Sequence, residues 1–201
     1  MFASEFMRRP LTTLRSKMIG FKLGSKGLII GPRAYIRGLS FMRIGSNFHA
    51  ADGLWMEAIS VFRDQVFAPQ IVIGDNVTIS HWTHIAATHY VEIGAGSLIG
   101  SKVIITDHNH GQYGGPHSSP LLMPAVRPLD TEHFVIIGRN VWLADGVVVT
   151  PGSRIGDGSI IGANSVVTSL IPPNTIAVGI PARAIKQYDF DLQKWISVQP
   201  S

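Results

Sequence analysis

Aliphatic residues recur at every sixth position through most of this chain, and this spacing restricts the possible folds more than any other feature. In the clearest run, each aliphatic residue is followed by a small one: Ile137-Gly138, Leu143-Ala144, Val149-Thr150, Ile155-Gly156, Ile161-Gly162 and Val167-Thr168. An earlier run covers Ile73, Ile79, Ile85 and Val91, slips by two residues and resumes at Ile93, Ile99 and Ile105. Six is not a helical period, but it is a multiple of the two-residue alternation of a β-strand.

Residues suited to tight turns lie between the aliphatic positions, as in Gly74-Asp75-Asn76 and Gly156-Asp157-Gly158. Short strands separated by turns at this interval predict a triangular coil, whose successive turns stack at about 4.8 Å with the aliphatic residues inside. A weaker instance at Ile30, Ile36, Met42 and Ile44 extends the pattern toward the N-terminus.

The segment from Ile155 to Val167 resembles the hexapeptide repeat of left-handed β-helix transferases. The segments 137–144 and 171–183 resemble maltose, galactoside and polysaccharide O-acetyltransferases. The resemblance implies an all-β, left-handed parallel β-helix over residues 28–186. A basic and helical segment, 1–27, would precede it, and a tail, 187–201, would follow.

Composition narrows the function further. The chain has no Cys, which excludes disulfides, a thiolate zinc site and a Cys nucleophile. Its 17 Lys and Arg exceed its 13 Asp and Glu, but they are scattered, so we expect no nucleic-acid partner. No apolar stretch is long enough to span a membrane, and a cytoplasmic location is expected. The basic N-terminal segment is expected to pack on the protein body, although it could instead rest on a membrane surface.

The repeat is interrupted at length only at residues 106–134, and a long loop inside a solenoid is usually functional. This loop contains four of the eight His residues: His108, His110, His117 and His133. The resemblance implies a homotrimer in which such a loop reaches a neighbouring subunit and one loop His acts as a general base. The acyl donor would be acetyl-CoA and the acceptor a sugar hydroxyl of a surface polysaccharide.

Two alignments of the loop favour different bases. Counting without gaps from Ile105 selects His110, which we place first, whereas the local Thr-x-His pattern selects His108. The other His would orient the loop. Asp107 would hold an imidazole in the required tautomer or contact the substrate, while His117 and His133 are expected to be surface or packing residues.

The resemblance also gives candidate contacts for the cofactor and the acceptor. The cofactor candidates are Trp142, Ala144, Ala163, Thr168, Ser169, Arg183 and Lys186. Asp145 is a further candidate. In the relatives, Ser or Gly is common at the position of Asp145 and Lys at the position of Ser169, so this chain departs from the pattern at both. Main-chain amides near Ala144 would stabilise the oxyanion. Trp82 and His84 are acceptor candidates or ordinary corner residues.

Two other activities fit the same coil. One is acetylation of an amino sugar on a nucleotide carrier. The other is a zinc hydratase similar to γ-type carbonic anhydrases, in which His84, His89 and a loop His would bind zinc. The loop and the Pro-Ala-Arg ending at residue 183 favour the transferases, so we expect no metal site.

Overall fold

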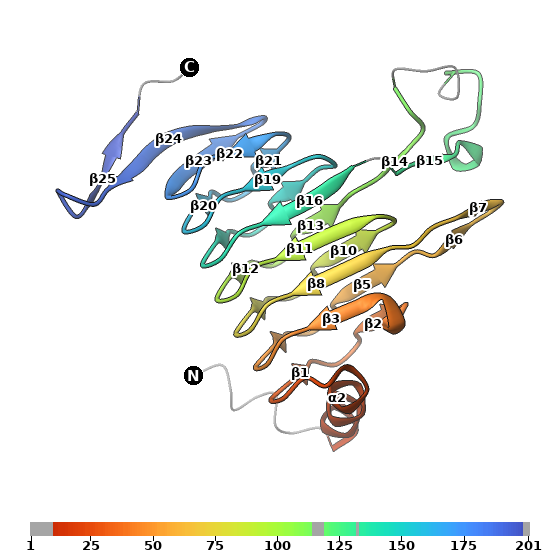
Figure 1. Ribbon diagram of the computed structural model, residues 1–201. Coiled ribbons are helices and arrows are strands. Elements are labelled where there is room, and N and C mark those ends of the chain that lie inside the picture. The colour runs from red at the N-terminus through yellow and green to blue at the C-terminus, as the bar shows by residue number, and fades with distance from the viewer. Residues whose placement is uncertain (1–9, 114–118, 132, 199–201) are drawn as a thin grey trace.

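The computed structural model describes residues 10–113, 119–131 and 133–198, and it is a left-handed parallel β-helix of stacked coils (Figure 1). The coil has three sides, because its strands fall into three stacked sheets. Its three faces are sheets of mostly short strands, which are parallel except for the antiparallel strands at the C-terminal end of sheet A. Sheet A contains, in spatial order, β1 (Ile29–Ile30), β4 (His49–Ala50), β9 (Thr78–Ile79), β12 (Leu98–Ile99), β17 (Trp142–Leu143), β20 (Ile160–Ile161), β23 (Thr175–Gly179), β24 (Ala182–Asp189) and β25 (Lys194–Ser197).

The other two faces have six strands each. Sheet B contains β2 (Tyr35–Arg37), β5 (Trp55–Ala58), β10 (His84–Ala87), β13 (Ile104–Thr106), β18 (Val148–Val149) and β21 (Val166–Val167). Sheet C contains β3 (Met42–Ile44), β8 (Gln70–Ile73), β11 (Tyr90–Ile93), β16 (Phe134–Ile137), β19 (Arg154–Ile155) and β22 (Leu170–Ile171).

The aliphatic residues of the repeat form the core, as the period predicts. In sheet A, each inward residue pairs with its counterpart in the next coil, and all are fully buried: Ile79 with Ile99, Ile99 with Leu143, and Leu143 with Ile161. Main-chain N–H groups of one coil donate to carbonyls of the next, as Trp142 does to Ser159 at 2.9 Å. Each residue therefore lies directly above its counterpart in the preceding coil.

The slip between Val91 and Ile93 has a structural cause. Three strands of sheet C, namely β8, β11 and β16, have four residues each and turn two side chains inward instead of one. Val91 and Ile93 are both fully buried on the same strand. The repeat therefore does not break there; the sheet C strand of this coil has a second inward residue.

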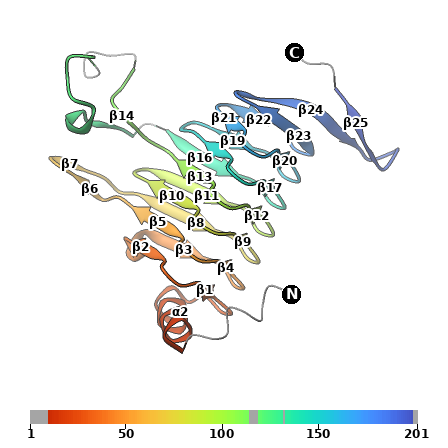
Figure 2. The same cartoon turned by 180° about the vertical axis from the view of Figure 1, so that it is seen from behind.

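The two ends of the coil carry different extensions. Helix α2 (Pro10–Leu23) lies against the first coil, where the Ser16 hydroxyl accepts the Ile30 N–H at 3.0 Å and Leu23 packs against the core (Figures 1 and 2). Residues 1–9 of the expected helical segment lie outside the described residues. Within the described ranges, no helix is long and apolar enough to cross a bilayer.

At the other end, the boundary expected after residue 186 falls inside β24. Strands β24 and β25 form an antiparallel hairpin that continues sheet A, so residues 187–197 are not a separate tail.

Two insertions interrupt the coil, and both leave it where sheet B passes to sheet C, which we call the B–C corner. The sequence predicts the one after β13, residues 106–134. It does not reveal the one after β5, a hairpin of β6 (Val61–Phe62) and β7 (Gln65–Val66). Figures 1 and 2 show both insertions extending from the same side of the coil.

The inward and outward alternation can be tested on one strand. Replacing the buried Ile99 by Ala removes core contacts between two coils, and we expect the free energy of unfolding to fall by about 2–5 kcal/mol. The matched Leu98→Ala change on the outer face, where Leu98 is 43% exposed, should cost less than about 1 kcal/mol. Denaturant unfolding measures both, and equal losses would contradict the assignment of the faces.

Candidate functional site at the B–C corner

The long loop begins with a buried carboxylate. Asp107 is 0% exposed, and its two oxygens accept the main-chain N–H groups of Thr88, His89 and Tyr90 at 2.8–3.1 Å. Three successive N–H groups directed at one anion form a nest that stabilises negative charge. Asp107 thus joins the start of the loop to the corner of the preceding coil.

The net effect on the Asp107 carboxyl favours its ionised form. Burial alone would raise its pKa, but hydrogen bonds from the His108 ring and from the N–H groups of Thr88 and His89 outweigh burial. The pKa of Asp107 therefore lies below its ordinary value, and the group is a carboxylate at neutral pH.

His108 is the imidazole that this carboxylate orients. Its Nδ1 lies 2.9 Å from Asp107 Oδ1 and 3.2 Å from the Thr106 hydroxyl oxygen, which assigns the Nδ1 proton to the carboxylate. The Nε2 atom has no hydrogen-bond partner among the residues that the structure describes. His108 thus offers an unpaired Nε2 lone pair, as a general base does.

His110 lies differently. Its ring is exposed and makes an edge contact with the Phe62 ring at a centroid distance of 5.5 Å, and within the described ranges no carboxylate pairs with it. His133 Nε2 lies 3.1 Å from Asp130 Oδ2, and its side chain is 43% exposed, whereas His117 is outside the described residues. The geometry therefore favours His108 as the base, the reverse of the order given by the ungapped count.

An exposed column of rings lies on the outer face of sheet B below the loop. Tyr35 and Trp55 meet edge to face at 5.8 Å, and Trp55 stacks at a tilt on His84 at 4.7 Å. Glu57 accepts hydrogen bonds from Arg37 and from the Trp55 indole. Burial lowers the pKa of His84, so this ring is neutral at pH 7.

His84 is thus on an outward face, as expected, but its companion differs from the prediction. Trp82 is at the A–B corner, where sheet A passes to sheet B; the Arg33 guanidinium covers its ring at 4.7 Å, and a Cβ at Gly53 would clash with it. Trp55, which the sequence analysis missed, takes the place beside His84. The available signal was that Trp55-Met56 and His84-Ile85 share one pattern, a ring followed by an inward aliphatic residue.

The seven predicted cofactor residues fall into two rows. Trp142 and Lys186 face outward on sheet A, and Ala144, Ala163 and Arg183 follow its edge at the A–B corner. Thr168 and Ser169 are exposed at the B–C corner, with Thr168 two coils beyond Thr106. One sheet separates the rows, so a single chain does not bring them together.

Whether a main-chain N–H at the A–B corner is hydrogen-bonded depends on the side chain at the equivalent position of the next coil. The Asp145 carboxylate accepts the Ser101 N–H at 2.7 Å, as Asp75 and Asp157 do for amides at the C–A corner. At the equivalent position above Asp145 stands Ala163, which has no acceptor. The Asp145 N–H consequently has no partner within the described ranges, and the Ala163 N–H has none there either.

The amide expected to stabilise an oxyanion is not free. The Ala144 N–H donates to the Ile161 carbonyl at 3.0 Å, as part of the ladder between coils. The Asp145 N–H, one residue later, is the donor available at this turn.

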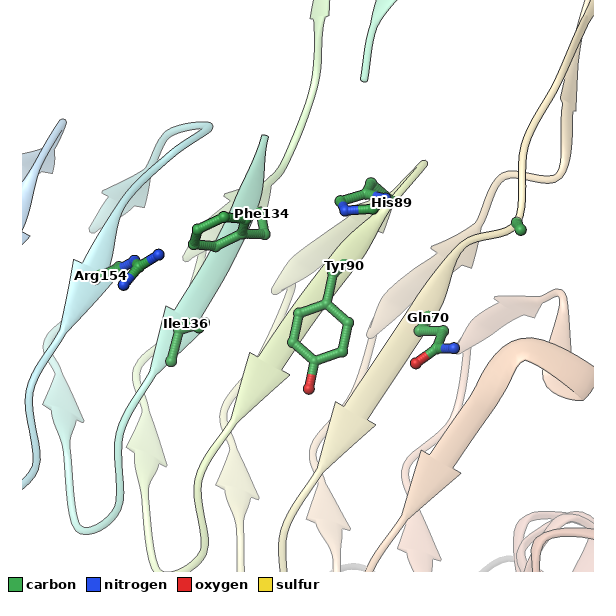
Figure 3. A pocket seen from close by; sticks show the side chains of 7 residues that line it. Gln70, His89, Tyr90, Phe134, Ile136 and Arg154 are labelled. Carbon is green, nitrogen blue, oxygen red and sulfur yellow. The ribbon is translucent and has the colours of Figure 1, made fainter. Parts of the chain in front are cut away.

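A hollow of about 360 Å³ lies on the sheet C side of the B–C corner (Figure 3). It is lined by Ala68, Gln70, His89, Tyr90, Phe134, Ile136 and Arg154. The Arg154 guanidinium stacks on the Phe134 ring at 4.4 Å. A hydrogen bond to Glu92 raises the pKa of Tyr90 to about 12. The hollow contains neither His108 nor Asp107.

The histidines considered as zinc ligands lie on different faces of the coil. His84 faces outward on sheet B, whereas His89 begins the sheet C side of the corner. Within residues 10–113, 119–131 and 133–198, no three His, Asp or Glu side chains gather as metal ligands would.

Comparison with known proteins identifies the family. The model of the bacterial transferase hexapeptide (six repeats) matches residues 134–169. The Escherichia coli protein WbbJ, whose assignment as an O-acetyl transferase of lipopolysaccharide biosynthesis is itself provisional, is 42% identical over 163 residues. The match covers 80% of this chain and 79% of WbbJ. The chain belongs to the hexapeptide-repeat acetyltransferase family.

Further relatives agree with this membership. Galactoside O-acetyltransferase of Escherichia coli is 29% identical over 158 residues, covering 79% of this chain and 63% of that enzyme. A solved galactoside acetyltransferase in complex with coenzyme A superposes with a TM-score of 0.59 at 25% identity, covering 96% of this chain and 82% of the other. The predicted family, fold and enzyme class are confirmed.

One solved N-acyltransferase shares the fold alone. A variant of AntD from Bacillus cereus, in complex with dTDP and coenzyme A, gives a TM-score of 0.64 at 19% identity, covering 88% of this chain and 90% of AntD.

The buried carboxylate has a measurable effect on stability. Asp107→Asn removes a charged acceptor from three amides and from His108, and we expect a loss of about 2 kcal/mol or more at pH 7. Because the folded pKa lies below the unfolded value of about 3.9, this stabilisation is present above about pH 4 and disappears as the pH falls through the folded pKa.

Denaturant unfolding across pH 3–7 measures this effect. The stability difference between the wild type and Asp107→Asn should shrink below about pH 4, with the exposed Asp64→Asn as control. A difference that does not change with pH would contradict the ionised carboxylate.

Proposed function

We propose that this chain transfers the acetyl group of acetyl-CoA to a sugar hydroxyl in surface-polysaccharide biosynthesis, with His108 as the general base. The observation that carries the proposal is the pairing of His108 Nδ1 with the buried Asp107, next to an exposed column of aromatic rings. The solved relatives in complex with coenzyme A and the identity with WbbJ support the donor and the acceptor class. A cytoplasmic location stays a prediction.

The chemistry follows from the geometry of His108. Its Nε2 takes the hydroxyl proton while the oxygen attacks the thioester carbonyl. The tetrahedral intermediate then collapses, the C–S bond breaks, and the imidazolium returns the proton to the CoA thiolate. Asp107 stabilises the transient positive charge, and the neutral His84 nearby does not oppose it. Such a base contributes about 10²–10⁴-fold to the rate.

The unpaired main-chain N–H groups of Asp145 and Ala163 suit the acyl donor, acetyl-CoA. They follow one another along the A–B corner at the spacing of successive coils, about 4.8 Å. N–H groups in such a row can donate to the amide and thioester oxygens of an extended pantetheine arm. Trp142 is 47% exposed beside this row, and Arg183 and Lys186 supply cationic groups for phosphates at its far end.

A complete site requires two protomers. His108, Thr168 and Ser169 border one edge of sheet B, and the amide row borders the other. In a trimer related by threefold symmetry, the B–C corner of one prism faces the A–B corner of the next, and a groove forms between them.

The aromatic column suits a sugar acceptor. Trp55 and Tyr35 offer apolar ring faces, and the Glu57 carboxylate has lone pairs left to accept hydroxyl protons. Acetylation of an amino sugar on a nucleotide is the second candidate, because AntD, which shares the fold, was solved with dTDP. Mass spectrometry after incubation with hydroxyl and amino acceptors distinguishes the two.

The assignment of the base predicts unequal effects of two substitutions. His108→Gln should lower kcat by about 10²–10⁴-fold while the KM for acetyl-CoA changes little, because only proton transfer is lost. His110→Gln should lower kcat by less than about ten-fold, since its ring lacks a carboxylate partner. Steady-state kinetics with acetyl-CoA measures both, and the opposite order would make His110 the base.

The unpaired Asp145 N–H predicts the effect of an Asp at position 163, a side chain that the fold already contains at the equivalent position 145. Ala163→Asp should cap the Asp145 N–H as Asp145 caps Ser101, and it should raise the KM for acetyl-CoA by about ten-fold or more. Ala163→Gly leaves the amide open and serves as control. An unchanged KM in the Asp variant would exclude this amide from the donor site.

Mixing two impaired variants tests the shared groove, provided that acetyl-CoA is kept well below the KM of Ala163→Asp, where both variants have low activity. If His108 and Ala163 of one site come from different protomers, coexpressed His108→Gln and Ala163→Asp chains regain about a quarter of the wild-type sites on random assembly. No recovery in mixed trimers, or a stable active monomer by gel filtration with light scattering, would contradict it.

A further inference from the structure

The hairpin β6–β7 contacts the active-site loop although 64 residues separate them in sequence. Gln65 forms two hydrogen bonds with the main chain of Leu129: its Oε1 accepts the Leu129 N–H at 2.7 Å, and its Nε2 donates to the Leu129 carbonyl at 3.1 Å. One side-chain amide thus satisfies both polar groups of a buried residue, as a neighbouring strand would.

Leu129 is also the residue opposite His110. Strands β14 (Asn109–His110) and β15 (Leu129–Asp130) form a two-residue antiparallel ladder in which His110 pairs with Leu129. From the other side, the Phe62 ring of the same hairpin meets the His110 ring. The hairpin therefore contacts both members of this pair.

This contact has a specific place in the loop. The ladder closes the loop immediately after Asp107 and His108, and two residues per strand are too few to form a stable hairpin alone. The long chain between its strands loses conformational entropy when the ladder forms. A contact from outside the loop offsets that cost, and the Gln65 side chain supplies it.

We propose that Gln65 is a positioning residue for acetyl transfer: it fixes Leu129, and through the β14–β15 ladder it holds the His108 ring in its place above sheet B. The inference rests on the proposed function, because it concerns the base of that reaction. Gln65 itself does not contact reacting atoms.

The test compares three hairpin variants in the full-length protein. Gln65→Met keeps the length of the side chain but neither hydrogen bond; Gln65→Glu keeps the acceptor and loses the donor. Val66→Ala, at the neighbouring residue that is 80% exposed, is the matched control. Hydrogen–deuterium exchange of residues 106–113 and 129–131 follows the loop, and kinetics with acetyl-CoA and the sugar acceptor follow the reaction.

In Gln65→Met we expect amide exchange to accelerate about ten-fold or more at Leu129, which loses its acceptor, and at Gly111, whose N–H donates to the Pro128 carbonyl in the ladder. The kcat should fall by about ten-fold, with the KM for acetyl-CoA and the exchange of the core strands unchanged. The exchange rates and the kcat of Gln65→Glu should lie between those of Gln65→Met and the wild type, and those of Val66→Ala should match the wild type.

Three results would overturn the inference. Unchanged exchange at Leu129 would show that Gln65 does not hold the loop. Faster exchange with an unchanged kcat would show that this contact does not position the base, and equal losses in kcat, acetyl-CoA affinity and core protection would make Gln65 merely structural. Absence of acetyl transfer in the wild type would refute the proposed function, while the exchange data would still decide whether the contact holds the loop.

Discussion

The hydrogen bonds between successive coils are the interaction on which the rest of this structure depends. Each coil donates its main-chain N–H groups to the carbonyls of its neighbour, so a residue's place in one coil is fixed by its counterpart in the next. Inward positions then form continuous aliphatic columns, and outward positions form equally regular columns of exposed side chains. The ring column of sheet B and the amide row at the A–B corner are both products of this registration.

The period of six was sufficient to predict the coil because burial depends on local alternation alone. It identified the inward residues from Ile73 onward, the outward direction of Trp142 and the start of the long loop. The slip at Val91 looked like an interruption because sequence spacing alone cannot distinguish a longer strand from a break. The structure accounts for it by two inward residues on one strand of sheet C.

The site was less predictable because it is made by residues from different coils. Asp107 lies beside His108 in sequence, but its partners Thr88, His89 and Tyr90 belong to the preceding coil. Stacking Trp55 beneath His84 requires the length of the hairpin between β5 and β8, which the aliphatic period does not reveal. Trp82 was a reasonable candidate by proximity, but the turn it occupies directs its ring to Arg33.

Both insertions leave the coil at the same corner, two coils apart, and touch each other outside it. A solenoid can accept extra chain at a corner without disturbing its ladder, so either segment could be replaced alone as far as the scaffold is concerned. The contact between Gln65 and Leu129 removes that independence. Exchange of these segments between members of this fold would have to transfer hairpin and loop together, as one unit of inheritance or of engineering.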